Sequence, residues 1–131
     1  MRLLLDTHVA IWGITDRARI SADVLELIEA PGTTVFVSTV CIWEIAIKHA
    51  RSPRRGAMPF SGREAMRHFM DAGLELLDVT AEHAAAVADL PPIHADPFDR
   101  LLIAQAFTEP MRLVTADRMV ARYSDMVILA G

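Results

Sequence analysis

The sequence contains a single cysteine, Cys41, among 131 residues. One thiol cannot form an intramolecular disulfide, and without a second thiol the chain cannot build a thiolate zinc site. We therefore interpret Cys41 as a small buried apolar residue.

Long apolar segments are also missing. No uncharged apolar run reaches the roughly 18 residues that a membrane-spanning helix requires. Only three leucines separate Arg2 from Asp6, which is too short an apolar stretch for a signal peptide. These absences predict a cytoplasmic protein that has no membrane partner. Repeats and low-complexity stretches are absent as well, and we predict one domain over residues 1–131.

The chain has no excess of positive charge. Its formal net charge of −4 argues against a protein that coats nucleic acid through charge alone. Basic residues are nevertheless concentrated between Lys48 and His68, where six of them accompany one acid. This basic segment is either a solvated surface or a positively charged surface beside an acidic site, where it would attract phosphate groups. The hydrophobic fraction of 53% is high for a soluble domain and favours contact with a partner or a second copy.

Short apolar runs alternate with segments of helical spacing along the whole chain. We predict strands at residues 3–5, 34–37, 74–79, 112–115 and 126–129. Helices are predicted to begin near residues 9, 21, 38, 62, 80, 97 and 118. Because the strands are apolar throughout, both faces of the sheet should be covered. The pattern predicts an α/β fold, specifically a three-layer α/β/α sandwich around a mostly parallel sheet.

Acidic residues occur where ligands bind in such sheets, at the carboxyl ends of the strands. Asp6 directly follows the first predicted strand, and Asp117 follows the fourth after one alanine. Glu44 shares a helical face with apolar neighbours three and four residues away, and Asp99 does the same on a later helix. We expect these four carboxylates to converge at one edge of the sheet.

Each acid also has a simpler explanation. Asp6 and Asp117 are common turn residues, Asp99 suits the first turn of a helix, and Glu44 can pair with Lys48. Together, however, the acids would repel one another, by roughly 3 kcal/mol for a pair 5 Å apart at an effective dielectric near 20. Oxygen ligands favour Mg²⁺ or Mn²⁺ as the compensating ion. Such ions support hydrolysis of phosphodiester bonds.

Four segments of the chain resemble the PIN-domain ribonucleases, and among them the VapC-type toxins of toxin–antitoxin pairs. The matching segments are LLLDTH at residues 3–8, VSTVCIWEIAIK at 37–48, DPFDRLLIAQA at 96–106 and LVTAD at 113–117. The resemblance implies the same α/β/α fold and Mg²⁺- or Mn²⁺-dependent cleavage of RNA. It also implies a cognate VapB-type antitoxin and a homodimer.

Carried onto this sequence, the resemblance makes Asp6, Glu44, Asp99 and Asp117 the metal-binding acids. Thr115 takes the place of the family's hydroxyl residue near the metal or the scissile phosphate. Thr7 and Asp96 also lie in the matching segments, but each has a purely structural alternative. Thr7 could simply begin a helix, and Asp96 could simply cap one.

Several residues near these acids have open roles. His8 and His94 could act as general bases, although a metal-bound water can supply the nucleophile. Arg100 could bind phosphate or neutralise the acids. Trp12 and Trp43 lie on apolar helical stretches and are expected in the core or in an interface.

Two other function classes compete with the nuclease. A phosphoaspartyl phosphatase or receiver domain also has an aspartate after a strand. The phosphatase pattern would require a second aspartate where His8 stands, and a receiver would require a lysine after a late strand, yet none follows Lys48. A non-catalytic interaction module would use the acids structurally, and such a module should be indifferent to metal.

Overall fold

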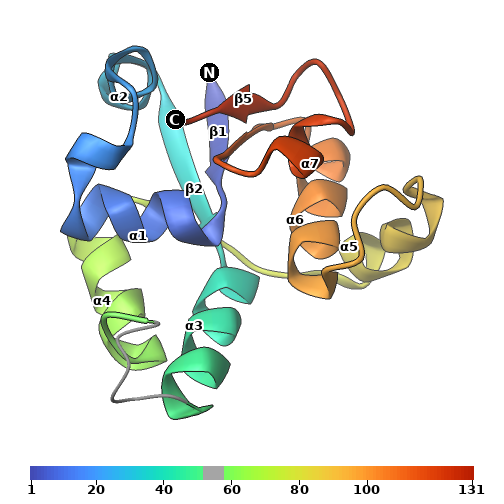
Figure 1. Cartoon of the computed structure of the whole chain (residues 1–131), viewed down its shortest axis with the longest axis horizontal. Coiled ribbons are helices and arrows are strands. Elements are labelled where there is room, and N and C mark those ends of the chain that lie inside the picture. Colours follow the sequence, from blue (N-terminus) through green and yellow to red (C-terminus); the bar gives the residue numbers. More distant parts are fainter. Residues whose placement is uncertain (52–57) are drawn as a thin grey trace.

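The computed structural model describes residues 1–51 and 58–131 (Figure 1). Its centre is a five-stranded sheet in the order β3-β2-β1-β4-β5. The strands are β1 (Arg2–Leu5), β2 (Thr34–Ser38), β3 (Glu75–Leu77), β4 (Arg112–Thr115) and β5 (Ile128–Leu129). Every pairing in this sheet is parallel. The α/β class with a central parallel sheet is confirmed.

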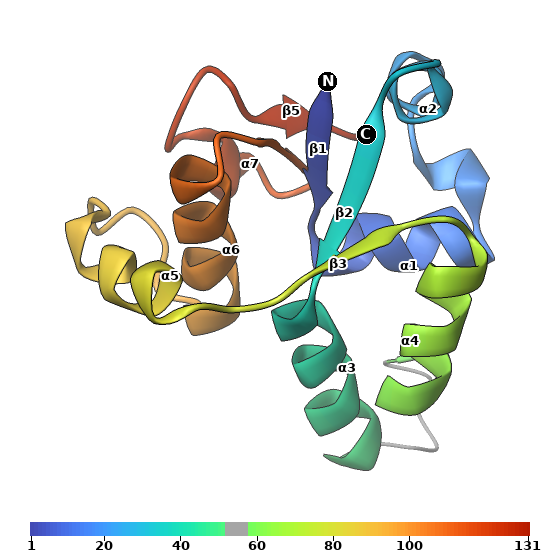
Figure 2. The same ribbon diagram turned by 180° about the vertical axis from the view of Figure 1, so that it is seen from behind.

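Helices lie on both sides of the sheet. Helices α1 (Thr7–Thr15), α2 (Ala22–Glu29) and α4 (Gly62–Asp71) lie on one side, and α3 (Thr39–Arg51) continues beyond the end of β2 (Figures 1 and 2). Helices α5 (Ala81–Ala86), α6 (Pro97–Thr108) and α7 (Arg118–Ala121) lie on the other side. Short 3₁₀ turns, η1 (Arg17–Arg19) and η2 (Val87–Asp89), follow α1 and α5. In the described part of the chain, no helix is long and apolar enough to span a bilayer.

The third strand is shorter than its sequence predicts. Within the described part of the chain it pairs with β2 alone, and the last register pair joins Ser38 to Leu77, where β2 ends. Leu74 donates its backbone N–H to Phe69 and so belongs to the turn after α4. Ser21, where the sequence predicts a helix to begin, stands directly before α2, but its side chain makes no capping hydrogen bond. Thr80 does cap α5, through a bond from the backbone of His83.

The centre of the sheet forms the core and also creates a crevice. Leu3, Leu4, Val37 and Val114, from the three inner strands, are completely buried. From β1 the chain crosses to β2 and β3, then returns to β4 on the other side of β1. The segments that follow β1 and β4 therefore diverge, and such a switch point leaves a crevice at the carboxyl ends of the strands.

Candidate metal centre

Asp6 and Asp117 lie at the two sides of this crevice. Asp6 follows β1 and caps α1, where one carboxylate oxygen accepts a hydrogen bond from the Val9 backbone at 2.9 Å. Asp117 caps α7 in the same way, with a 2.8 Å bond from the Met119 backbone. Register explains why they are neighbours, because β1 and β4 pair directly and the Asp6 N–H donates to the Val114 carbonyl.

Thr115 connects the two acids. Its hydroxyl donates to the second oxygen of Asp6 and accepts the backbone N–H of Asp117 at 3.0 Å. The Thr115 side chain is completely buried. Both of these hydrogen bonds are made to the predicted acids or their backbone, within the protein rather than towards solvent.

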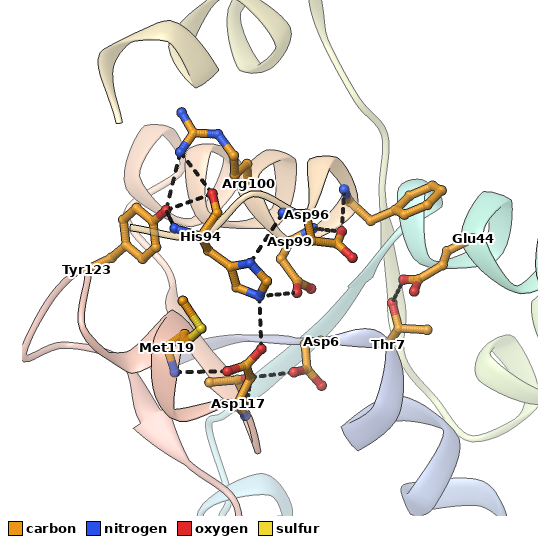
Figure 3. A network of polar contacts seen from close by, with 12 residues as sticks. Asp6, Thr7, Glu44, His94, Asp96, Asp99, Arg100, Asp117, Met119 and Tyr123 are labelled. Atoms are coloured by element: carbon orange, nitrogen blue, oxygen red, sulfur yellow. Dashed lines mark hydrogen bonds and ion pairs between the residues drawn. The ribbon is translucent and has the colours of Figure 1, made fainter. Parts of the chain in front are cut away.

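Helix α6 brings Asp99 to the crevice. Asp96 is the N-cap of this helix and accepts bonds from the backbones of Phe98 and Asp99, at 2.8 and 3.1 Å. Pro97 occupies the first helical position, where its missing N–H costs nothing. This start orients the first turn, so that Asp99 points toward His94 and Asp117 (Figure 3).

His94 lies between Asp99 and Asp117. Its Nε2 atom is 3.1 Å from an Asp99 oxygen and 3.0 Å from an Asp117 oxygen (Figure 3). One ligand atom from each of these three residues lies within 4.8 Å of the other two. The sequence pointed to His94 only as a possible base, and its position between two acids depends on the tertiary structure.

Glu44 has different surroundings. It is 4% exposed, and one oxygen accepts a 2.6 Å bond from the Thr7 hydroxyl. The other oxygen pairs with the Lys48 ammonium at 2.5 Å. The i, i+4 pair expected from the sequence is therefore present, and Glu44 already has a cationic partner. Arg54 and Arg55 of the basic segment lie outside the described residues.

The acids share one cavity of about 380 Å³, lined by Asp6, Glu44, Asp99 and Asp117 together with His94 and Lys48. Burial raises the pKa of Asp99 to about 7, and the neighbouring charges of Asp96, Asp6 and Glu44 add to the shift. Burial also raises the pKa of Asp6. Because the charged forms of both carboxyl groups are destabilised, the cavity favours a compensating cation. The oxygen-rich donor set fits Mg²⁺ or Mn²⁺.

Other candidate residues do not contribute in the expected way. Arg100 donates to backbone carbonyls, including those of Val87 and Pro91, and to the Tyr123 hydroxyl. Its guanidinium therefore stabilises the segment that precedes α6. Trp43 is 57% exposed, which excludes the core and leaves the interface alternative for this residue, whereas Trp12 is partly buried against the core. His8 is exposed and lines the cavity. Tyr123 accepts the His94 backbone N–H at 2.7 Å, and no sequence pattern indicated it.

The sequence matches the PIN domain family over residues 3–126. Among solved structures, it is similar to VapBC2 from Rickettsia felis bound to a DNA fragment from its promoter, with a TM-score of 0.71, 21% identity and coverage of 98% of this chain and 97% of that chain. For DNA-bound VapBC from Salmonella typhimurium, the TM-score is 0.67 and the identity 14%, with coverage of 98% of this chain and 96% of that chain. For VapBC-1 from nontypeable Haemophilus influenzae, the TM-score is 0.66 and the identity 14%, with the same two coverages of 98% and 96%. No curated protein sequence matches significantly. The structural likenesses show a shared fold, and the match over nearly the whole sequence shows that this chain belongs to the PIN domain family.

Proposed function

We propose that this chain is a metal-dependent endoribonuclease and that residues 1–131 form one nuclease domain. The observation that carries the proposal is one cavity, at the switch point of the sheet, that is lined by carboxylates from four separate segments. Membership of the PIN domain family supports nuclease activity.

The proposed metal ligands are Asp6, Glu44, Asp99 and Asp117, and the proposed ion is Mg²⁺ or Mn²⁺. Of these acids, Asp99 and Asp117 have His94 as their neighbour, and Glu44 has Lys48. When bound, such an ion polarises a phosphoryl oxygen and lowers the pKa of a coordinated water.

The residues around the acids hold them in place. Thr115 donates to Asp6 and accepts from the backbone of Asp117, so it sets the spacing between the segments after β1 and β4. Thr7 orients Glu44 by donating its hydroxyl to one oxygen of that carboxylate. We propose that Thr115 supports catalysis through these contacts, because its buried hydroxyl is already bonded to the acids.

We also propose that the chain is the toxin of a toxin–antitoxin pair, with a small VapB-type antitoxin as its partner. The similarity to VapBC complexes supports this role. Large apolar side chains, among them Trp43, Phe107 and Met126, are about half exposed and suit contacts with an antitoxin or in a homodimer.

The test is cleavage of a mixed RNA substrate in Mg²⁺ or Mn²⁺, in chelator, and with an Asp6→Asn variant. Asp71→Asn is the matched control, because Asp71 is an exposed acid at the end of α4. Cleavage that requires both the metal and Asp6, and that survives Asp71→Asn, would support the nuclease. A folded protein that neither cleaves RNA nor binds metal by calorimetry would favour the interaction module instead.

A further inference from the structure

His94 contributes the one nitrogen of the three-residue cluster that it forms with Asp99 and Asp117. A histidine at this position can act in two ways. Its Nε2 atom can coordinate the ion, which requires a lone pair there. Alternatively, Nε2 can carry a proton and donate to the two carboxylates. In a neutral ring these two roles need opposite tautomers.

The other ring nitrogen distinguishes the two roles. The backbone N–H of Asp96 donates to Nδ1 of His94 at 3.2 Å. An atom that accepts a hydrogen bond carries a lone pair, so the proton of the neutral ring is on Nε2. A metal-binding histidine usually donates its second ring N–H to a carboxylate or carbonyl, which is the reverse of this arrangement.

The loop around His94 holds the ring in this orientation. The Tyr123 hydroxyl accepts the His94 backbone N–H at 2.7 Å, and Arg100 donates to the His94 carbonyl at 3.4 Å. Asp96, whose N–H contacts Nδ1, is itself fixed as the N-cap of α6. A ring turned over by 180° would place carbon atoms at both contacts. The tautomer is therefore determined by the backbone and not by the acids alone.

We propose that His94 is a positioning residue that donates its Nε2–H to Asp99 and Asp117 and is not a ligand of the metal. These acids come from α6 and from the turn after β4, and no shared backbone ladder joins the two segments at this point. A donor between them offsets their repulsion and holds their oxygens at a fixed spacing. The inference about the metal rests on the proposed function, whereas the tautomer is a property of the protein without metal.

Two substitutions separate the two sides of the ring. In His94→Gln the amide nitrogen can reach the position of Nε2, so the donor to the acids is retained. In His94→Asn the amide oxygen can reach the position of Nδ1, so the contact with the Asp96 N–H is retained and the donor is lost. Loss of a residue that orients metal ligands typically weakens metal binding by about 10- to 100-fold. We expect a loss of this size in His94→Asn, and a change below about 3-fold in His94→Gln.

The experiment has three measurements. Calorimetry gives Mn²⁺ affinity for the wild type and both variants. Electron spin-echo spectroscopy of the Mn²⁺-loaded wild type shows whether an imidazole nitrogen is bound, and we expect no such coupling. Nitrogen NMR of the metal-free wild type shows which ring nitrogen carries the proton, and we expect Nε2 alone.

Imidazole coupling to Mn²⁺, a proton on Nδ1, or equal affinity in the three proteins would each overturn the proposal. A wild type that binds no Mn²⁺ while its NMR spectrum shows the proton on Nε2 alone would refute the metal centre. In that case the hydrogen-bonding role of His94 would stand without it.

Discussion

The two sides of the acidic cavity differ in how their charge is compensated. On one side, Glu44 is paired with Lys48 and bonded to Thr7, so a cation is already present. On the other side, among the residues that the structure describes, Asp99 and Asp117 share the imidazole of His94 alone, and burial raises the pKa of Asp99 to about 7. The demand for an added cation is therefore concentrated near Asp99.

Asp99→Asn should reduce RNA cleavage by at least about 100-fold. Loss of a metal ligand should reduce activity at least as much as loss of a residue that only orients a ligand, which typically costs about 10- to 100-fold. The same change removes a destabilised carboxylate, so the metal-free melting temperature should rise at pH 8. Metal-induced stabilisation should fall. Thermal unfolding with and without Mn²⁺ measures both effects. A variant that is less stable without metal, and equally stabilised by it, would contradict the charge comparison.

Lys48→Met should destabilise the metal-free protein by about 1–3 kcal/mol, because it leaves the buried Glu44 without its cation. The lower part of the range allows for solvent screening of the partly exposed lysine. Added Mn²⁺ should then stabilise this variant more than the wild type. Arg63→Met, which changes an exposed cation of α4, is the control. An equal metal response in Lys48→Met and the wild type would show that the two sides act independently.

The metal-free protein should lose stability as pH rises from about 4 to about 7. The raised pKa of Asp99 means that the folded state holds a proton which the unfolded state has released, so stability falls with pH in this window and levels off above it. We expect Asp99 to contribute on the order of 2 kcal/mol to this loss of unfolding free energy. This is less than the full pKa shift implies, because the Asp99 side chain is partly exposed to solvent. Urea unfolding at several pH values measures it. Asp99→Asn should reduce this slope and leave the part that comes from the raised pKa of Asp6, and an unchanged slope in the variant would assign it to other groups.

Thr115→Val should cost about 1–2 kcal/mol of stability, because the substitution removes the hydroxyl that bonds to Asp6 and to the backbone of Asp117. Metal affinity should fall by about 10-fold, since Asp6 loses its orientation. Thr115→Ser keeps the hydroxyl and should retain most of the affinity. If both variants bind metal as the wild type does, Thr115 has no role in arranging the acids.

Much of the architecture follows from local patterns. Apolar runs predict the buried inner strands, and β4 at Arg112–Thr115 begins and ends where the sequence predicts. The end of β3 was not predictable, because it depends on where its partner strand, β2, stops. The short helix α7 begins at Arg118, as the sequence predicts, and ends at Ala121.

The sequence alone predicts which acids follow strands and which share an apolar helical face, because strand and helix periodicities are local properties. From this it predicted that Asp6, Glu44, Asp99 and Asp117 would meet, and all four line one cavity. How the charges of these acids are compensated depends on the folded chain. Lys48 compensates Glu44, while Tyr123 and Arg100 hold the His94 loop against Asp99 and Asp117. Charge compensation depends on distances between segments that are far apart in the chain, and no local pattern specifies those distances.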